Sequence, residues 1–461
     1  MNFHSHYSGI RTPVETCIIG TGGFGQSFIA QGQHVGLMGA RIAVDRDGET
    51  AAKALQLSGV AAERIRVCRD ARAAASAWAD GLFVAAGSLE TVIDLPFQVL
   101  VEATGHPEAA ARHALLAIEA GRHVALVTKE TDSVCGPGLA LIARDRGLVV
   151  TPVDGDQPSL LIGLISWAEV LGLEIVAAGK SSEYDFVFDR ARGTLTSNEV
   201  SRPLPELIGA WDIGARDPRE VSAARERLIG ERFRLRAVPD LCELTLVANA
   251  TGFDPDRADF HAPVARIPEV AGLFAERHQG GLLGGARRLD VFHHLRAPDE
   301  ASFAGGVFIV VRCQDRISWD MLARKGHTVS ASGDTAMLYL PRHILGLEAA
   351  TSILDAAGLG RSGHGDDYRP RIDLVAVAER DLAAGTVLTA SGHHHTIDGV
   401  GAEMRPAASL AADRPAPFYL VADRPLARAV RAGEPIRLED IVVDDRSTLF
   451  GLRLRQDQLF A

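Results

Sequence analysis

The chain has 461 residues, and its 48 Lys and Arg against 59 Asp and Glu give a formal net charge of −11. The sequence pI near 5.8 argues against a nucleic-acid-binding protein, which normally carries a basic domain or stripe. The sequence contains no run of about 18 or more uncharged apolar residues, so it predicts no membrane span. At roughly 150 residues per domain, the length predicts two or three domains.

The cysteines and lysines are informative because of how they are used. The five cysteines include no Cys-x-x-Cys pair, which disfavours a disulfide framework or a zinc site and predicts a cytoplasmic protein. Only four lysines occur among the 48 basic residues: Lys53, Lys129, Lys180 and Lys325. Lysine is a compact charge whose pKa shifts readily on burial, whereas arginine stays charged. The four lysines therefore either occupy positions where arginine cannot replace them or remain by chance in a sequence that otherwise uses arginine.

The first predicted region, residues 1–152, alternates short apolar runs with helical stretches. The predicted strands are Glu15–Gly20, Ala40–Val44, Ile65–Cys68, Phe97–Glu102, His123–Thr128 and Leu148–Thr151. The predicted helices are Gly23–Gln33, Gly48–Ser58, Ala71–Ala79, Pro107–Ala120 and Gly138–Arg146. This alternation predicts an α/β fold, with βαβ units around a parallel sheet in an N-terminal Rossmann domain.

A glycine-rich motif, GTGGFG at residues 20–25, follows the first predicted strand and opens the first helix. Gly20 would allow a tight turn, Gly22 would let the backbone approach a pyrophosphate, and Gly25 would let helix and strand pack closely. With Gly23 and Phe24, these residues are the candidate dinucleotide site. A tight turn with chance glycines is the alternative.

Asp45 and Arg46 follow the second predicted strand, and Asp45 lies 20 residues after Gly25. An acid at this distance is expected to accept hydrogen bonds from the adenosine ribose and to repel a 2′-phosphate. The motif therefore predicts NAD(P) binding with NAD favoured, although Arg46 would partly offset the repulsion. A solvated strand end is the alternative.

Two further strand ends carry candidate residues. Thr104 and Gly105 follow the strand that ends at Glu102, and Lys129 follows His123–Thr128. Because ligands bind outside the carboxyl ends of strands in open α/β sheets, we expect Thr104, Gly105 and Lys129 at the nicotinamide end of the cofactor. A strand–helix turn and a lysine that extends to solvent are the alternatives.

The second predicted region, residues 153–369, is a central α+β domain built on a mostly antiparallel sheet. Leu173–Ala178, Leu241–Ala250 and Gly306–Arg312 are predicted strands, and Pro158–Leu171 and Pro341–Ala357 are predicted helices, the latter able to pack on the first domain. Asp154 and Asp156 join the first two regions. Domain junctions often hold substrates, but Asp156 also suits a helix N-cap.

Polar residues at the ends of these strands complete the candidate site. Lys180 follows the strand that begins at Leu173, Asn249 lies at the end of Leu241–Ala250, and Lys325 stands in a glycine turn. A cluster of cations would suit a phosphate, a carboxylate or a developing alkoxide, or would supply a general acid of tuned pKa.

The third predicted region, residues 370–461, is small and β-rich. Its two halves, Asp381–Thr389 and Ala429–Leu438, each place a glycine turn before an apolar run. The tract His393–His395 lies in this region without an obvious carboxylate partner. We interpret the tract as an exposed turn and predict no metal site from it.

Taken together, these motifs resemble one family, the 1-deoxy-D-xylulose 5-phosphate reductoisomerase-like enzymes, which are relatives of homoserine dehydrogenase. The motifs that carry the resemblance are residues 20–25, Ala103–Gly105, Val127–Glu130, Asp154–Ser159, Gly179–Lys180, Ala248–Gly252, Lys325 and Pro341–Glu348. From about Arg371 the chain is similar to a SAF domain. The resemblance implies a homodimer in which residues 153–369 form the central catalytic and dimerisation domain. It also implies a phosphorylated ketose that is reduced and rearranged with NADPH.

By position, the resemblance places Lys129 at the nicotinamide and Lys180, Asn249 and Lys325 around a small-molecule substrate. It also places Arg342 or His343 nearby, with Asp154, Asp156 and Ser182 as further candidate substrate ligands. Two departures from the family pattern weaken the assignment of a phosphosugar substrate and of NADPH as cofactor. The family has a second lysine where this chain has Ser182, and a strand end suited to NADPH where this chain has Asp45.

Three functions remain open from the sequence. The first is an NAD(P)-dependent dehydrogenase or oxidoisomerase of a small polyol, hydroxy acid or ketose. The second is the NADPH-dependent reductoisomerase itself, for which a divalent metal is possible but not indicated by the sequence. The third is a non-catalytic dinucleotide-binding sensor, which has no need of buried lysines at strand ends.

Overall fold

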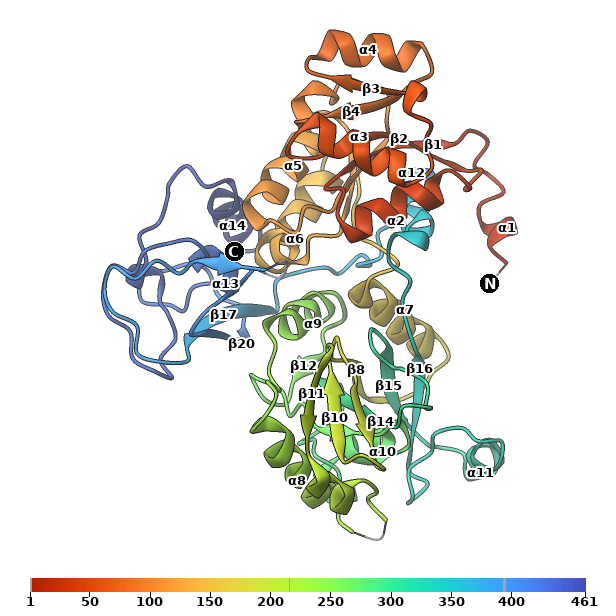
Figure 1. The fold of residues 1–461 in the computed structure, drawn as a ribbon, viewed down its shortest axis with the longest axis vertical. Helices are drawn as coiled ribbons and strands as arrows, with labels where there is room; N and C mark the ends of the chain where they lie inside the picture. Colours follow the sequence, from red (N-terminus) through yellow and green to blue (C-terminus); the bar gives the residue numbers. More distant parts are fainter. Residues whose placement is uncertain (1, 215, 393–394) are drawn as a thin grey trace. The chain divides into compact units, whose positions relative to one another are not determined.

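The structure is a computed structural model that describes residues 2–214, 216–392 and 395–461 (Figure 1). The chain forms two compact units. Unit 1 comprises Met1–Ser159, Ile344–Ala402 and Pro406–Ala461, and unit 2 comprises Leu160–His343 with Glu403–Arg405. The first and third predicted regions therefore belong to the same unit, while the boundaries 1–152, 153–369 and 370–461 stay a prediction.

Unit 1 contains a seven-stranded parallel sheet in the order β3-β4-β2-β1-β5-β6-β7. Its strands are β1 (Val14–Ile19), β2 (Met38–Val44), β3 (Ile65–Cys68), β4 (Phe83–Ala86), β5 (Val99–Glu102), β6 (His123–Leu126) and β7 (Val150–Pro152). Because β1 lies between β2 and β5, the strand order reverses at β1 and β5, where doubly wound sheets bind ligands. The predicted α/β fold with an N-terminal Rossmann domain is confirmed.

Helices cover this sheet and complete its core. They are α2 (Gly23–Gly32), α3 (Gly48–Leu57), α4 (Ala71–Ala79), α5 (Pro107–Glu119), α6 (Lys129–Arg144) and α12 (Ala350–Leu359), with a short α1 (Phe3–His6) before β1. Ile353 and Leu354 of α12 are buried in the same apolar cluster as Ile18 of β1 and Val101 of β5. A segment two hundred residues downstream thus supplies part of the Rossmann core.

The sequence prediction omitted β4. Its four residues, FVAA, are all buried, so the strand shows no alternation of apolar and polar residues. A short continuous apolar run cannot be assigned from periodicity alone.

Unit 2 contains a mixed sheet in the order β11-β10-β9-β14-β8-β15-β16, with β12 and β13 also paired to β14. The strands are β8 (Ile175–Ser181), β9 (Phe186–Asp189), β10 (Thr194–Ser197), β11 (Val200–Pro203), β12 (Asp254–Pro255), β13 (Val264–Ala265), β14 (Arg288–Arg296), β15 (Val307–Arg312) and β16 (Thr335–Leu340). The helices are α7 (Gln157–Val170), which begins in unit 1, α8 (Pro218–Gly230), α9 (Val238–Thr251), α10 (Ile267–Leu273) and α11 (Arg316–Arg324).

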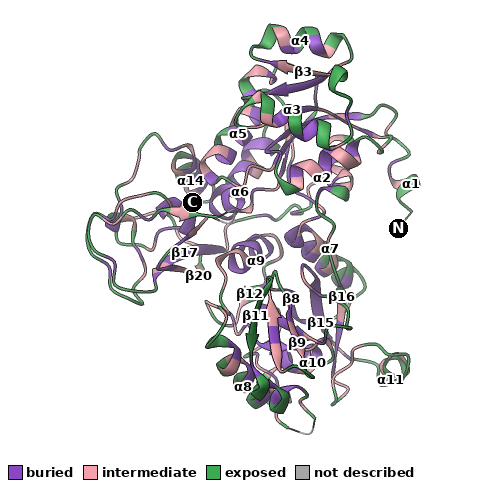
Figure 2. Cartoon of the chain, in the orientation of Figure 1, coloured by how far each residue is buried: buried purple, intermediate pink, exposed green. Residues whose placement is uncertain are grey.

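The predicted strand Leu241–Ala250 is wrong, because these residues form most of helix α9. Proline occupies the first turn of α9, and Gly252 ends it with φ +71°, which are common start and stop signals for a helix. Every residue from Asp240 to Asn249 is buried, as the colouring of Figure 2 shows. A helix that is buried all round has no polar face, so its apolar run was mistaken for a strand.

The last part of the chain carries a small antiparallel sheet in the order β17-β20-β19-β18. Its elements are β17 (Ile372–Ala378), β18 (Ala390–Ser391), β19 (Thr396–Ile397), β20 (Val400–Pro406), α13 (Phe418–Val421) and α14 (Thr448–Leu459). This agrees with the predicted small β-rich region. Nowhere in the part of the chain that the structure describes is a helix both long and apolar enough to cross a membrane.

Candidate functional site

The glycine motif forms the turn between β1 and α2, and its glycines divide into two kinds. A Cβ on Gly20, whose φ is +91°, would lie 2.4 Å from the carbonyl oxygen of Ala103, and a Cβ on Gly25 would lie 2.1 Å from that of Gly20. A Cβ on Gly22 or Gly23 would meet no atom within 4 Å. The fold itself therefore requires Gly20 and Gly25, whereas Gly22 and Gly23 border open space at the N-terminus of α2.

Asp45 closes this turn from the end of β2. Its Oδ2 accepts hydrogen bonds from the backbone N (2.8 Å) and Oγ1 (2.6 Å) of Thr21, and its Oδ1 accepts one from Arg46 N (2.8 Å). The Arg46 side chain itself is exposed. Asp45 thus ties the end of β2 to the glycine turn, and its Oδ1, which accepts a single hydrogen bond, keeps a lone pair for a further donor.

A pocket of about 420 Å³ lies beyond Asp45, at the carboxyl ends of β2, β3 and β4. It is lined by residues 46–49, residues 67–69, Gly87, Ser88 and Thr91. Arg46 and Arg69 make this end of the sheet able to receive an anionic or planar group. The pocket adjoins the glycine turn through Asp45 and Arg46.

Glu102, the last residue of β5, is a buried hub that the sequence analysis missed. It is completely buried. Thr104 Oγ1 donates to its Oε1 (2.6 Å), Thr128 Oγ1 donates to its Oε2, and His113 Nδ1 lies 3.4 Å from Oε1. Gly105 N donates in turn to Thr128 Oγ1 (3.0 Å). Glu102 therefore joins the loop after β5 to the start of α6.

Lys129 is the first residue of α6 rather than the last of a strand, since β6 ends at Leu126. Its Nζ lies 3.2 Å from Asp156 Oδ1, so the structure brings Lys129 and Asp156 together. Asp154 is held differently: it accepts hydrogen bonds from Ser159 Oγ (2.6 Å) and Thr351 Oγ1 (2.5 Å). Asp154 fixes α12 against the segment before α7, whereas Asp156 neutralises a cation.

Lys180 lies within β8 and is 2% exposed. Its Nζ donates to Asp240 Oδ1 (2.8 Å) and to Glu243 Oε2. Burial alone would lower the pKa of Lys180, but the charges of Asp240 and Glu243 outweigh it and hold that pKa above the ordinary lysine value. Lys180 therefore stays protonated at neutral pH and is a fixed cation, not the general acid of lowered pKa that we considered.

Polar neighbours surround Lys180. Ser182 Oγ donates to Asp240 Oδ2 (3.0 Å), which places this predicted residue in the cluster. His293 of β14 is buried, and burial holds its pKa below the ordinary value. Lys180, Ser182, Asp240 and Glu243 form what we call the Lys180 cluster.

The other predicted residues of unit 2 lie on α9, at the end of α11 and after β16. Asn249 is buried in the last turn of α9. Lys325 is an exposed residue at the C-terminal end of α11, which projects from the sheet (Figure 1). Arg342 is exposed, and His343 Nδ1 lies 2.9 Å from the carbonyl oxygen of Gly305.

The two acids of the Lys180 cluster, Asp240 and Glu243, are not predicted from the sequence, because the prediction of a strand at Leu241–Ala250 places no pair of acids on one face. Residues three apart lie on the same face of a helix but on opposite faces of a strand. Asp240 and Glu243 have this spacing. A correct helix assignment would have made two acids on one buried face a visible signal.

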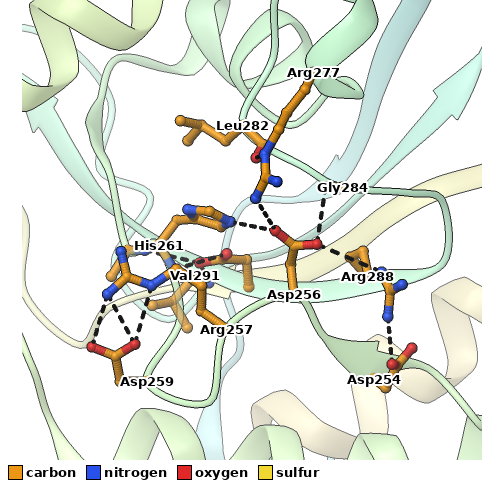
Figure 3. A network of polar contacts seen from close by, with 12 residues as sticks. Asp254, Asp256, Arg257, Asp259, His261, Arg277, Leu282, Gly284, Arg288 and Val291 are labelled. Atoms are coloured by element: carbon orange, nitrogen blue, oxygen red, sulfur yellow. Dashed lines mark hydrogen bonds and ion pairs between the residues drawn. The ribbon is translucent and has the colours of Figure 1, made fainter.

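A second polar network of unit 2, around Asp256, contains none of the predicted residues (Figure 3). Asp256 accepts hydrogen bonds from His261 Nε2 (2.8 Å), Arg277 Nη2 (3.0 Å) and Gly284 N (2.9 Å). Burial would raise the pKa of Asp256, but the bonds from His261 and Gly284 outweigh it and hold that pKa below the usual value. The network is internally neutralised and joins β12 to the loop before β14.

Metal ligation has no candidate among residues 2–214, 216–392 and 395–461, where no group of three or more His, Cys, Asp or Glu could hold an ion. His393 and His394 of the predicted exposed tract lie outside the described residues. The ring of His395 packs edge-on against that of His106, with centroids 5.0 Å apart.

Comparison with known families gives one match. Residues 239–349 match the family described as "Oxidoreductase DRL, catalytic domain". The matched segment contains Asp240, Glu243 and Asn249 of α9. The match, most of which lies in unit 2, confirms the prediction of an oxidoreductase enzyme. No curated protein matches the chain at a significant level.

Solved structures with a similar fold are dehydrogenases and reductases. A levoglucosan dehydrogenase in complex with NADH and L-sorbose is 16% identical, covers 40% of this chain and 45% of that chain, and has a TM-score of 0.26. Biliverdin reductase from Synechocystis sp. PCC 6803, in complex with biliverdin and NADP+, is 21% identical; the match covers 38% of this chain and 48% of that chain, with a TM-score of 0.25. A homoserine dehydrogenase from Thiobacillus denitrificans is 14% identical; the match covers 81% of this chain and 84% of that chain, with a TM-score of 0.37. The chain spans about half the length of the first two, and TM-scores this low carry no functional argument.

Proposed function

We propose that the protein is an NAD(P)-dependent oxidoreductase that transfers a hydride to or from a CH–OH carbon of a small polyol, hydroxy acid or ketose. The observation that carries this proposal is the open space over Gly22 and Gly23. A Cβ at either position would meet no atom within 4 Å from elsewhere in the described chain, so packing does not require these glycines. A ligand phosphate that approaches the backbone at the N-terminus of α2 does require them.

The residues present fit a dinucleotide. The turn at Gly22 and the first turn of α2 would hold the pyrophosphate, Asp45 would accept from the adenosine ribose, and the pocket beside Arg46 and Arg69 would hold the adenine. Thr104 and Gly105 would border the nicotinamide end. When bound, the cofactor would supply the hydride donor or acceptor, which no side chain can replace.

The two lysines would have different tasks in this reaction. Lys129, at the carboxyl-end side of the sheet, would stabilise the charge on the substrate oxygen as hydride moves. Lys180 would keep its proton and act as a fixed cation, while Asp240 or Glu243 would accept a proton. Asn249, Lys325, Arg342 and His343 stay predictions for substrate contacts.

Substitution of Gly22 by alanine tests the cofactor site. Gly22→Ala should leave thermal unfolding nearly unchanged, because its Cβ meets no atom, and should weaken NADH binding by about tenfold or more, or ~1.4 kcal/mol. NADH binding is measured from its fluorescence on titration with protein. Gly36→Ala is the matched control, since Gly36 also faces open space. Unchanged NADH affinity in Gly22→Ala would remove the proposed site.

The preference between NADH and NADPH needs a side-by-side titration. We propose NAD, because the Asp45 carboxylate would repel a 2′-phosphate. Tighter binding of NADH supports Asp45 as the ribose ligand. Tighter binding of NADPH, lost in Arg46→Ala, would reverse the assignment.

A reductoisomerase-like enzyme with a SAF domain is the second candidate, favoured by Arg46 and Arg69 at one pocket, since two arginines suit the 2′-phosphate of NADPH. Turnover of 1-deoxy-D-xylulose 5-phosphate with NADPH would establish this candidate, and inert folded protein would exclude it. A homodimer that acts on a small molecule in the cytoplasm, without nucleic acid, stays part of the proposal.

A further inference from the structure

Helix α6 carries Lys129 on its first turn and a proline in its interior. Its interior contains Gly136-Pro137-Gly138. Proline has no N–H to continue the helical hydrogen bonds and crowds the preceding turn, and glycine favours the unfolded backbone. The first two turns of α6 are therefore poorly held by the helix itself.

A side chain from the last helix of the chain contacts α6 on both sides of Pro137. Gly138 N donates to Gln456 Oε1 (2.9 Å), and Gln456 Nε2 donates to the carbonyl oxygen of Val134 (3.3 Å). In a regular α-helix the N–H of residue 138 donates to the carbonyl oxygen of residue 134. The buried amide of Gln456 on α14 thus bonds both the donor and the acceptor of this pair across Pro137.

Gly138 is shaped for this contact. A Cβ at Gly138 would lie 2.7 Å from the Cβ of Gln456. The glycine therefore admits α14 rather than merely weakening α6.

A second contact holds α6 on the N-terminal side of Pro137. Asp132, one turn after Lys129, accepts a hydrogen bond from Tyr368 Oη (2.7 Å), and His364 Nε2 lies 3.0 Å from its other oxygen. A Cβ at Gly136 would lie 1.6 Å from Asp132 Oδ1 and 2.8 Å from Tyr368 Oη. Gly136 thus leaves room for this contact, as Gly138 does for Gln456.

We propose that Gln456 and Asp132 are positioning residues for Lys129, and that the C-terminal part of the chain holds the first turn of α6 so that the Lys129 ammonium stays beside Asp156. The inference rests on the proposed role of Lys129 in the reaction. It gives the C-terminal region a positioning role in unit 1, since residues that precede and follow the small antiparallel sheet in the sequence both form hydrogen bonds with α6. Tyr368 precedes β17, and Gln456 lies on α14.

The scarcity of lysine makes the proposal directly testable. Reductive methylation with ¹³C-formaldehyde labels accessible lysines and the α-amino group, and the chain has only four lysines. The signal of Lys129 is assigned by its loss in Lys129→Arg. In Gln456→Ala it should shift toward the signals of the exposed Lys53 and Lys325, while those two signals stay in place. Gln458→Ala is the matched control, an exposed glutamine on the same helix.

A second variant guards against misfolding of the first. Tyr368→Phe removes one hydroxyl and should shift the Lys129 signal in the same direction, with circular dichroism confirming the fold. A Lys129 signal that keeps its position in both folded variants would overturn the positioning role. A merely structural role would lower the unfolding temperature without moving this one signal.

Addition of NADH separates this inference from the proposed function. The positioning role is measured without nucleotide. A wild-type Lys129 signal that shifts with NADH supports Lys129 at the nicotinamide end. A signal that ignores saturating NADH would contradict that function, while a shift in Gln456→Ala would still establish the positioning role.

Discussion

Units 1 and 2 each place a lysine beside a carboxylate, but in different surroundings. Lys129 begins a helix after a strand end, with 18% of its side chain exposed, and pairs with Asp156 at 3.2 Å. Lys180 lies within a strand, 2% exposed, and pairs with Asp240 and Glu243, which are each 5% exposed. Lys129 can therefore exchange a protein partner for a ligand, whereas removal of Lys180 leaves two buried acids without their cation.

The same difference extends to how the two sites are built. In unit 1 the backbone of a glycine turn does most of the shaping, and Asp45 and Glu102 tie neighbouring loops together. In unit 2 the charges lie between a strand and the buried helix α9. Sites of the first kind are local in sequence, while sites of the second kind depend on which elements pack together.

The largest expected effect separates the two lysines. Lys180→Met should lower the free energy of unfolding by roughly 3–5 kcal/mol, because it leaves two buried carboxylates uncompensated. Lys129→Met should lower it by on the order of 1–2 kcal/mol. Chemical denaturation monitored by circular dichroism measures both changes.

Two further variants sharpen this result. The triple change Lys180→Met, Asp240→Asn and Glu243→Gln should recover much of the lost stability, because no buried charge remains. Lys325→Met is the exposed control, expected within about 0.5 kcal/mol of wild type. Equal losses at Lys129 and Lys180 would contradict the contrast between the two sites.

A buried acid of unit 2 offers a pH-dependent test. Burial raises the pKa of Asp290 to about 6, although the backbone N–H groups of Ala262, His261 and Val291 donate to it. The folded state therefore holds this proton more tightly than the unfolded state. Its contribution to stability is greatest below about pH 4 and falls as the pH rises towards 6.

Asp290→Asn should remove this pH dependence. The stability of wild type relative to Asp290→Asn should fall by about 2 kcal/mol between pH 4 and pH 7, as measured by denaturation at each pH. Asp299→Asn, a substitution of an exposed aspartate, is the control. A difference that grows with pH would mean that the N–H donors outweigh burial.

A smaller effect is expected at the hub of unit 1. Glu102→Gln places an amide donor opposite the hydroxyl donors of Thr104 and Thr128, so it should lower the free energy of unfolding by on the order of 1 kcal/mol. It should also weaken NADH binding, because the loop at Gly105 is then held less firmly. Thermal unfolding and NADH fluorescence measure these changes. Glu119→Gln, exposed at the end of α5, is the matched control. If NADH affinity stays at the wild-type value, Glu102 supports only the fold.

The sequence by itself determined the parallel α/β class of the first region and its glycine turn, although not the buried strand β4. Strand, turn and helix follow one another within residues 14–32, and the acid of β2 lies at a fixed distance downstream, so local chemistry and spacing suffice. It also determined that lysines are rare enough to be informative. These features need no knowledge of which distant segments meet.

Only the tertiary structure decided which charges pair. Lys180 meets acids 60 and 63 residues away, on a segment whose uniform burial hid its helical period. Lys325, an equal candidate in sequence, lies exposed at the end of α11. Gln456 and Gly138 of α6, which form a hydrogen bond, are 318 residues apart in the sequence. Burial and long-range packing set these partners, because a charged residue is forced to find an opposite charge only once its neighbours remove it from water.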